Sequence, residues 1–253
     1  VLFLSKYRVF QNLILNSFIW KYRNHYLDLC DASDYFVLLS NEFKPEFSRL
    51  IGKVLPKNVI AISNPVSFQD AYQYDSDAKI KEVLFVGRIS NSEKRVDLLL
   101  KVWQRICKKY PDWKLTIVGN GNDMSRMEAL ANELDLENYS FEGYKAPKEY
   151  YKRASLFCMT SSFEGFGIVL VEAMHYGVVP LAFNSYASVT DIIHDRGNGF
   201  LVNPFDVEEY AKTMELLIEN ESLREKVALN AINSSKRFSV ENIGEKWLSL
   251  FNE

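Results

Sequence analysis

Short apolar runs alternate with amphipathic helical patterns from about residue 82 onward, and this alternation restricts the chain to few architectures. The predicted strands are residues 83–86, 114–118, 139–141, 156–159, 178–183 and 200–202. The predicted helices are residues 96–110, 124–134, 147–153, 168–176, 207–219, 222–236 and 240–251. Continuous apolar strands between helices are typical of a parallel sheet covered on both faces. We therefore expect an α/β fold that binds ligands beyond the carboxyl ends of its strands.

The N-terminal third of the chain shows a weaker pattern. Two strands are predicted at 35–39 and 59–62, with a helix beginning near Glu42 between them. Residues 67–81 are polar and lack periodicity, which predicts a linker. The expected organisation is an incomplete domain with its linker over 1–81, a complete domain over 82–238 and a last helix over 239–253.

Composition excludes several classes of protein. The net charge of −3 offers no basic field for nucleic acid. The three cysteines are scattered, which excludes a disulfide framework and a structural zinc site and suits the reducing cytoplasm. No apolar stretch of about 20 residues predicts a membrane span. Residues 1–25 hold four cations and no acid, so we expect peripheral contact with the inner face of a membrane or packing on a neighbouring domain.

Charged loops follow two of the strands in the complete domain. The first begins at Gly87 and holds Arg88 and Lys94, a fork-shaped donor and a mobile point charge that suit a diphosphate or belong to a solvated loop. The loop after the strand 156–159 holds Glu164, and Glu172 follows eight positions later. Helix N–H groups near residue 168 would face an anion in the same crevice. Two carboxylates there suit sugar hydroxyls, whereas the alternative is a helix cap plus a surface glutamate.

The glycine pair after the strand 114–118 resembles the start of a dinucleotide fingerprint. Gly119 and Gly121 are present, but Met124 stands where the third glycine belongs. A tight turn that approaches a ligand through its backbone is therefore favoured over an NAD site. Asp75-Ser76-Asp77 has a metal-binding form but lies in the predicted linker, and the histidines are spread out, so no metal site is predicted.

Five motifs in this order resemble the retaining glycosyltransferases of family four (group 1), which have the GT-B fold of two Rossmann-like domains. The motifs are VLFVGRISNSEKRVDLLLKVW, LTIVGNGND, FEGY, SSFEGFGIVLVEAMHYGVVPLAF and NGFLVNPFD. The resemblance covers about residues 58–253, and 30–40 look like the end of the N-terminal domain. It implies that 82–238 bind the donor and that the last helix crosses back to the N-terminal domain. Val1 then stands at a truncation point within that domain.

The resemblance also implies roles for individual residues. Arg88 and Lys94 match the pair that binds the donor diphosphate, and Glu164 matches the carboxylate that contacts the transferred sugar. Glu172 matches the acceptor of ribose hydroxyls. The other implied donor-binding residues are Gly87, Gly121, Tyr144, Lys145, Gly165, Phe166, Gly167 and Ile168. Arg95 and Asp191 depart from the family pattern, where Gly and Glu are usual.

The implied reaction is transfer of a hexose from a UDP-, GDP- or ADP-linked sugar to a hydroxyl of a glycan or lipid-linked acceptor. Anomeric configuration would be retained without a metal or other cofactor. The implied setting is cytoplasmic assembly of surface polysaccharide or lipopolysaccharide. Two alternatives stay open: a nucleotide-sugar-binding half without turnover, which an incomplete N-terminal domain would favour, and an NAD-dependent enzyme.

Overall fold

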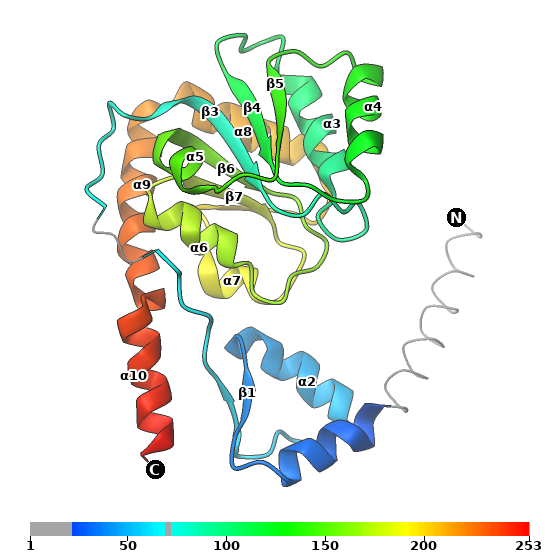
Figure 1. The fold of residues 1–253 in the computed structure, drawn as a ribbon, viewed down its shortest axis with the longest axis vertical. Coiled ribbons are helices and arrows are strands. Elements are labelled where there is room, and N and C mark those ends of the chain that lie inside the picture. Colours follow the sequence, from blue (N-terminus) through cyan, green and yellow to red (C-terminus); the bar gives the residue numbers. More distant parts are fainter. Residues whose placement is uncertain (1–21, 69–71, 253) are drawn as a thin grey trace, which may run out of the picture. The chain divides into compact units, whose positions relative to one another are not determined.

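The computed structural model describes residues 22–68 and 72–252 (Figure 1). Contacts divide the chain into two compact units, Val1–Ser63 and Asn64–Glu253. Most of the basic segment 1–25 lies outside the described residues, so the expectation of membrane contact stays a prediction. Within the described part of the chain, no helix has the length and apolar character needed to cross a membrane.

The first unit contains a small parallel sheet packed on helices. Residues 22–31 are helical, and β1 (Phe36–Leu38) pairs with β2 (Val59–Ala61) in parallel. A 3-10 turn (Asn41–Phe43) leads into α2 (Lys44–Ile51), which ends at Gly52 in the left-handed conformation. The unit's core cluster consists of Cys30, Phe47, Ile51 and Val59. The two predicted strands and the helix between them are confirmed.

The second unit is built on a six-stranded sheet with the order β5-β4-β3-β6-β7-β8, and every neighbouring pair is parallel. Its strands are β3 (Ile80–Val86), β4 (Lys114–Val118), β5 (Tyr139–Gly143), β6 (Ala154–Met159), β7 (Val179–Phe183) and β8 (Phe200–Val202). The predicted parallel sheet is therefore confirmed.

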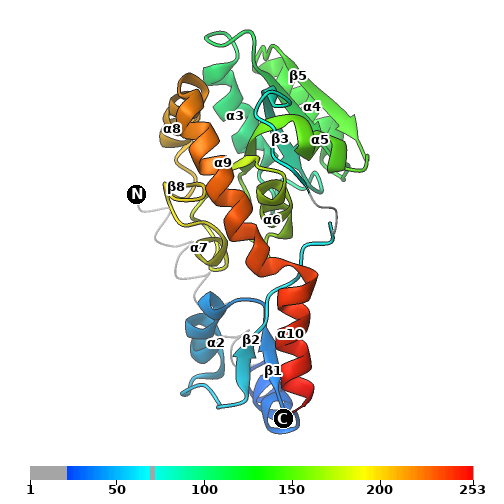
Figure 2. The ribbon, with the colours of Figure 1, turned by 90° about the vertical axis from the view of Figure 1, so that its left-hand side faces the viewer.

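Helices cover both faces of this sheet, with α5 and α6 on the face opposite α3 and α8 (Figure 2). They are α3 (Val96–Ile106), α4 (Met124–Glu133), α5 (Lys148–Arg153), α6 (Ile168–His175), α7 (Val189–Ile192), α8 (Val207–Glu219), α9 (Glu221–Ser235) and α10 (Val240–Phe251). The sequence did not predict α7, because four residues are too few to show a helical period.

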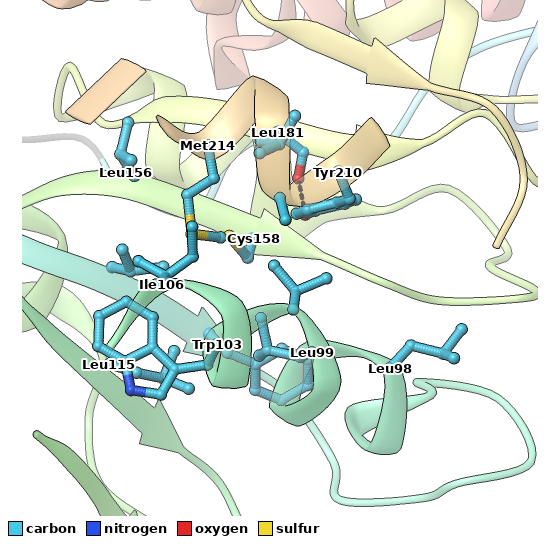
Figure 3. Packing of buried hydrophobic residues seen from close by; sticks show 14 of the residues in the cluster. Leu98, Leu99, Trp103, Ile106, Leu115, Leu156, Cys158, Leu181, Tyr210 and Met214 are labelled. Atoms are coloured by element: carbon cyan, nitrogen blue, oxygen red, sulfur yellow. Dashed lines mark hydrogen bonds between the residues drawn. The ribbon is translucent and has the colours of Figure 1, made fainter. Parts of the chain in front are cut away.

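The core between α3, α8 and the sheet consists of large apolar side chains whose few polar atoms are paired (Figure 3). Trp103 donates its indole N–H to the carbonyl of Glu137 at 2.9 Å. Tyr210 donates its hydroxyl to the carbonyl of Leu181 at 2.5 Å. Buried aromatic residues with polar atoms need such partners, because an unpaired buried donor destabilises the fold.

The predicted linker packs on the second unit, which begins at Asn64 instead of at residue 82. The ring of Phe68 lies 5.1 Å from that of Tyr176, and the ring of Tyr72 lies 5.0 Å from it. Tyr74 covers Gly177, where an added Cβ would come within 2.5 Å of its ring. Aromatic side chains attach this connector (residues 64–68 and 72–79) to the second unit, and their irregular spacing shows no periodic signal. Its Asp75-Ser76-Asp77 stretch forms a turn, with the Asp77 N–H donating to Asp75 Oδ1 at 3.0 Å.

The connector also supplies a buried amine. Lys79 Nζ donates to the carbonyl of Tyr151 at 3.0 Å and to that of Tyr176 at 2.7 Å. Both carbonyls lie at C-terminal helix ends, where the helix dipole favours a cation. Burial nevertheless lowers the pKa of Lys79 to about 7.

This pKa predicts that stability depends on pH through Lys79. Unfolded chains bind more protons at this amine between pH 7 and its ordinary pKa of 10.5, so the free energy of unfolding should rise over that interval. Chemical denaturation at pH 7, 8 and 9 should show this rise in the wild type relative to Lys79→Met, which has no amine. Parallel pH dependences of the two proteins would contradict the prediction.

Candidate functional site

The strand order places one crevice at the centre of the sheet. From β3 the chain proceeds outward through β4 and β5, and it then returns to place β6 on the other side of β3. Loops that follow two such neighbouring strands run in opposite directions and leave an opening at the carboxyl edge. The loops after β3, β4 and β6 therefore meet at this edge, and they hold most of the predicted site residues.

A salt bridge joins the loops on the two sides of this switch point. Lys94 Nζ lies 2.5 Å from Glu164 Oε1, and the side chains are only 17% and 11% exposed. The Ser161 hydroxyl donates to the same oxygen at 2.7 Å. Glu164 Oε2 accepts no hydrogen bond from the residues that the structure describes. Because the pair is shielded from water, the Coulomb attraction between its two charges is stronger than in an exposed salt bridge, and this offsets part of the cost of burying them.

Further hydrogen bonds hold the three loops together. Ser162 N–H donates to the carbonyl of Glu93 at 2.7 Å, which joins the β6 and β3 loops. Asn91 N–H donates to Asp123 Oδ2 at 2.8 Å, which joins the β3 and β4 loops. The crevice rim is thus fixed by main-chain contacts on both sides of β3.

A cavity of about 420 Å³ opens beside this rim. Five of the residues predicted to bind the donor line it: Gly87, Arg88, Tyr144, Lys145 and Glu172. The Arg88 side chain is 65% exposed and forms a salt bridge with Glu93. The ring of Tyr144 is 89% exposed. Two cations, a carboxylate and an open aromatic ring therefore face one space.

Neighbouring groups shift the pKa values of two carboxylates here, Glu142 and Glu172. Lys145 donates to Glu142 at 2.7 Å, and the Tyr150 hydroxyl donates to the same oxygen at 3.0 Å. The contact with Lys145 above all lowers the pKa of Glu142 to about 2. Burial raises the pKa of Glu172, although hydrogen bonds from the Tyr151 hydroxyl, which donates to Oε2 at 3.0 Å, and from Ser67 oppose the rise. The sequence did not identify Tyr151, since helical periodicity does not show where a hydroxyl points.

Glycines permit two close approaches between loops. A Cβ on Gly119 would lie 1.8 Å from the carbonyl oxygen of Gly87, and a Cβ on Gly121 would lie 2.1 Å from that of Ile89. Both positions thus require glycine for the contact between the β4 and β3 loops. Gly121 is not among the residues that line the cavity, so its predicted ligand contact stays a prediction.

The turn before α6 presents its main chain, whereas its aromatic side chain is buried. Gly167 has φ of +91° at the N-cap, and α6 begins at Ile168 as predicted. Phe166 packs on Phe238 with ring centroids 5.6 Å apart, and its carbonyl accepts from the Ser188 hydroxyl at 3.0 Å. Gly165 has open space around it. Any ligand contact of Phe166 would therefore be through its backbone.

Metal coordination receives no support from the described residues. No group of three or more His, Cys, Asp or Glu side chains within residues 22–68 and 72–252 is arranged to hold a metal ion.

A comparison with known protein families finds a match that spans the five motifs from the sequence. The family described as "Glycosyl transferases group 1" matches residues 69–234, which is more than half of the chain. The chain belongs to the group 1 glycosyltransferases. The resemblance carried by the five motifs is confirmed.

Individual relatives show the same family. An uncharacterised glycosyltransferase of Haemophilus influenzae is 35% identical over 198 residues, which is 77% of this chain and 55% of that protein. An α-1,4-N-acetyl-D-galactosaminyltransferase of Campylobacter jejuni, whose name gives an undecaprenol-linked acceptor, is 29% identical over 238 residues, or 93% of this chain and 64% of that protein. The chain thus spans 55% and 64% of these two relatives.

Solved structures show the fold. A mutant of S. aureus TarM in complex with fondaparinux, α-GlcNAc-glycerol and UDP is 26% identical, has a TM-score of 0.78, and covers 88% of this chain and 45% of its own. The apo galactosyltransferase WaaB of the lipopolysaccharide outer core is 22% identical, has a TM-score of 0.70, and covers 87% and 62%. Both are GT-B glycosyltransferases, so the predicted fold class is confirmed.

The glycine contacts predict different costs for two equally small changes. Gly121→Ala places a methyl group against the Ile89 carbonyl and should lower the melting temperature by several degrees. Gly165→Ala meets open space and should change the melting temperature by about one degree or less. Thermal unfolding of both variants beside the wild type measures the difference, and equal losses would contradict the close approach described for Gly121.

Proposed function

We propose that this chain binds a nucleotide-diphosphate sugar and takes part in transferring its hexose to an acceptor hydroxyl with retention of anomeric configuration. The acceptor is a glycan or a lipid-linked glycan of cytoplasmic surface-polysaccharide assembly. The observation that carries this proposal is the Lys94–Glu164 pair at the switch point, in the loops beside the cavity that Arg88 and Glu172 line. Cations that can bind phosphate and carboxylates that can accept hydrogen bonds from sugar hydroxyls therefore lie at one edge of the sheet.

Diphosphate binding would exchange two existing salt bridges. Arg88 is paired with Glu93, and Lys94 is paired with Glu164. A diphosphate offers more negative charge than either carboxylate, and it would draw both cations toward its oxygens. The same cations would then stabilise the charge that develops on the departing diphosphate. We propose that these side chains and the start of α6 supply this stabilisation without a metal ion.

The two glutamates would hold different parts of the donor. Glu172 faces the cavity from α6, where the Tyr151 hydroxyl and Ser67 both bond its carboxylate, and the carboxylate can accept ribose hydroxyls beside these contacts. Glu164 has an oxygen without a partner among the described residues, and it can accept a hydroxyl of the transferred sugar. When Lys94 moves to the diphosphate, the second oxygen of Glu164 also loses its cation.

Uridine is the nucleoside we propose for the donor. The TarM structure contains UDP, and the Campylobacter relative is named for transfer of an N-acetylhexosamine. The exposed ring of Tyr144 at the cavity offers a flat apolar face on which a base can stack. Relatives are also named for poly(ribitol-phosphate) and lipopolysaccharide as acceptors, which supports an acceptor that belongs to a surface glycan.

Removing either cation should impair both binding and transfer. Arg88→Ala and Lys94→Ala should each weaken UDP binding about tenfold and lower sugar transfer at least about a hundredfold, since one lost contact to a developing anion typically costs about 3–4 kcal/mol. Calorimetry with UDP and a transfer assay with UDP-hexoses measure these effects. Lys108→Ala removes an exposed lysine paired with Asp135 and should leave both measurements unchanged.

Each outcome of this experiment supports or contradicts the proposal. Wild-type affinity and turnover in both cation variants would overturn the assignment of the diphosphate site. Binding of UDP without transfer or donor hydrolysis would instead show a nucleotide-sugar-binding half that does not turn over. Preference for GDP or ADP would correct the nucleoside, and binding of a nicotinamide dinucleotide would point to the NAD alternative.

A further inference from the structure

Tyr151 is held at both of its polar ends. Its hydroxyl donates to Glu172 Oε2 at 3.0 Å, and its main-chain carbonyl accepts from Lys79 Nζ at 3.0 Å. The side chain is completely buried, and its ring stacks on that of Tyr176 with centroids 6.1 Å apart and planes within 9°. A side chain enclosed and bonded in this way has one available orientation, so its hydroxyl points at Glu172 before any ligand arrives.

Lys79 ties together the two helices that carry this donor and its acceptor. Tyr151 lies on α5, whereas Glu172 lies on α6 one turn before Tyr176, the C-cap of that helix. Lys79 Nζ donates one hydrogen bond to the carbonyl of Tyr151 and another to the carbonyl of Tyr176. One amine from the connector therefore fixes the spacing between the C-terminal parts of α5 and α6, and with it the spacing between the Tyr151 hydroxyl and the Glu172 carboxylate.

We propose that Tyr151 is a positioning residue for the donor: its hydroxyl holds Oε2 of Glu172 and orients the carboxylate toward the ribose. This inference rests on the proposed function, because it requires Glu172 to contact the nucleotide. Tyr151 itself acts only through Glu172. The connector, through Lys79, is the anchor of this arrangement.

The hydroxyl can be removed without disturbing the packing. The ring contacts Phe68, Phe157 and Tyr176, and a phenylalanine would keep all three contacts. Tyr151→Phe therefore removes only the hydrogen bond to Glu172. A purely structural role predicts that this change affects stability alone, whereas a positioning role predicts a change in donor affinity and in its dependence on pH.

The predicted result for Tyr151→Phe is about tenfold weaker binding of UDP, measured by calorimetry. When UDP affinity is measured against pH, the loss of affinity at low pH should also begin at a higher pH than in the wild type. The reason is that the hydroxyl stabilises the ionised carboxyl, so its loss raises the pKa of Glu172 further. Among the described residues, the other titratable side chains that line this cavity are Arg88, Tyr144 and Lys145, and they are the same in both proteins.

Two further variants complete the test. Tyr139→Phe removes a hydroxyl that bonds Asn132, and it should bind UDP as the wild type does. Glu172→Gln cannot ionise, so it should lose the acid limb that Glu172 contributes and should bind UDP weakly. Adding Tyr151→Phe to Glu172→Gln should weaken binding no further, because the hydroxyl acts through the carboxylate.

The outcomes separate the inference from the function on which it rests. Tyr151→Phe with wild-type UDP affinity and an unchanged loss of affinity at low pH would overturn the positioning role. Loss of cooperative unfolding in that variant would overturn it as well. If the losses of UDP-binding free energy caused by Tyr151→Phe and Glu172→Gln simply added in the double variant, the positioning role would also be overturned. Wild-type affinity in Glu172→Gln, by contrast, would contradict the proposed contact between Glu172 and the donor.

Discussion

The salt bridge between Lys94 and Glu164 can form only because β3 and β6 are neighbours at the point where the strand order reverses. Nearly buried charges must be paired, so this contact ties the two loops together across the crevice. The β4 loop then packs on the β3 loop through Gly119 and Gly121, which leave no room for a side chain. The rest of the candidate site lies on the rim that results.

The rim is also stabilised by contacts at the C-terminal parts of α5 and α6, which Lys79 bonds. The N-terminus of α6 follows the β6 loop, and its C-terminal carbonyl is bonded by Lys79. The connector therefore holds α6 at the end opposite the crevice, and Tyr151 transmits the same restraint to Glu172 from α5. Binding groups whose positions are set before the ligand arrives lose less entropy when they engage it.

Much of the fold could be predicted from the sequence, because buried parallel strands are continuous apolar runs that need no tertiary information to recognise. The same reasoning pointed to Arg88 and Glu172, since loops after parallel strands meet at one edge, whereas Lys145 followed only from the family resemblance. It did not place the connector on the second unit, because Phe68, Tyr72 and Tyr74 pack without a regular period. Nor could it identify Tyr151, whose task depends on a contact between two helices.

The proposed function depends most on a diphosphate taking Lys94 from Glu164. A crystal structure of this chain with a bound UDP-hexose tests that claim directly. It should show Lys94 Nζ within hydrogen-bonding distance of a phosphate oxygen and Glu164 accepting a hydroxyl of the sugar. A complex in which Lys94 still contacts Glu164, with the diphosphate bound elsewhere, would contradict the account.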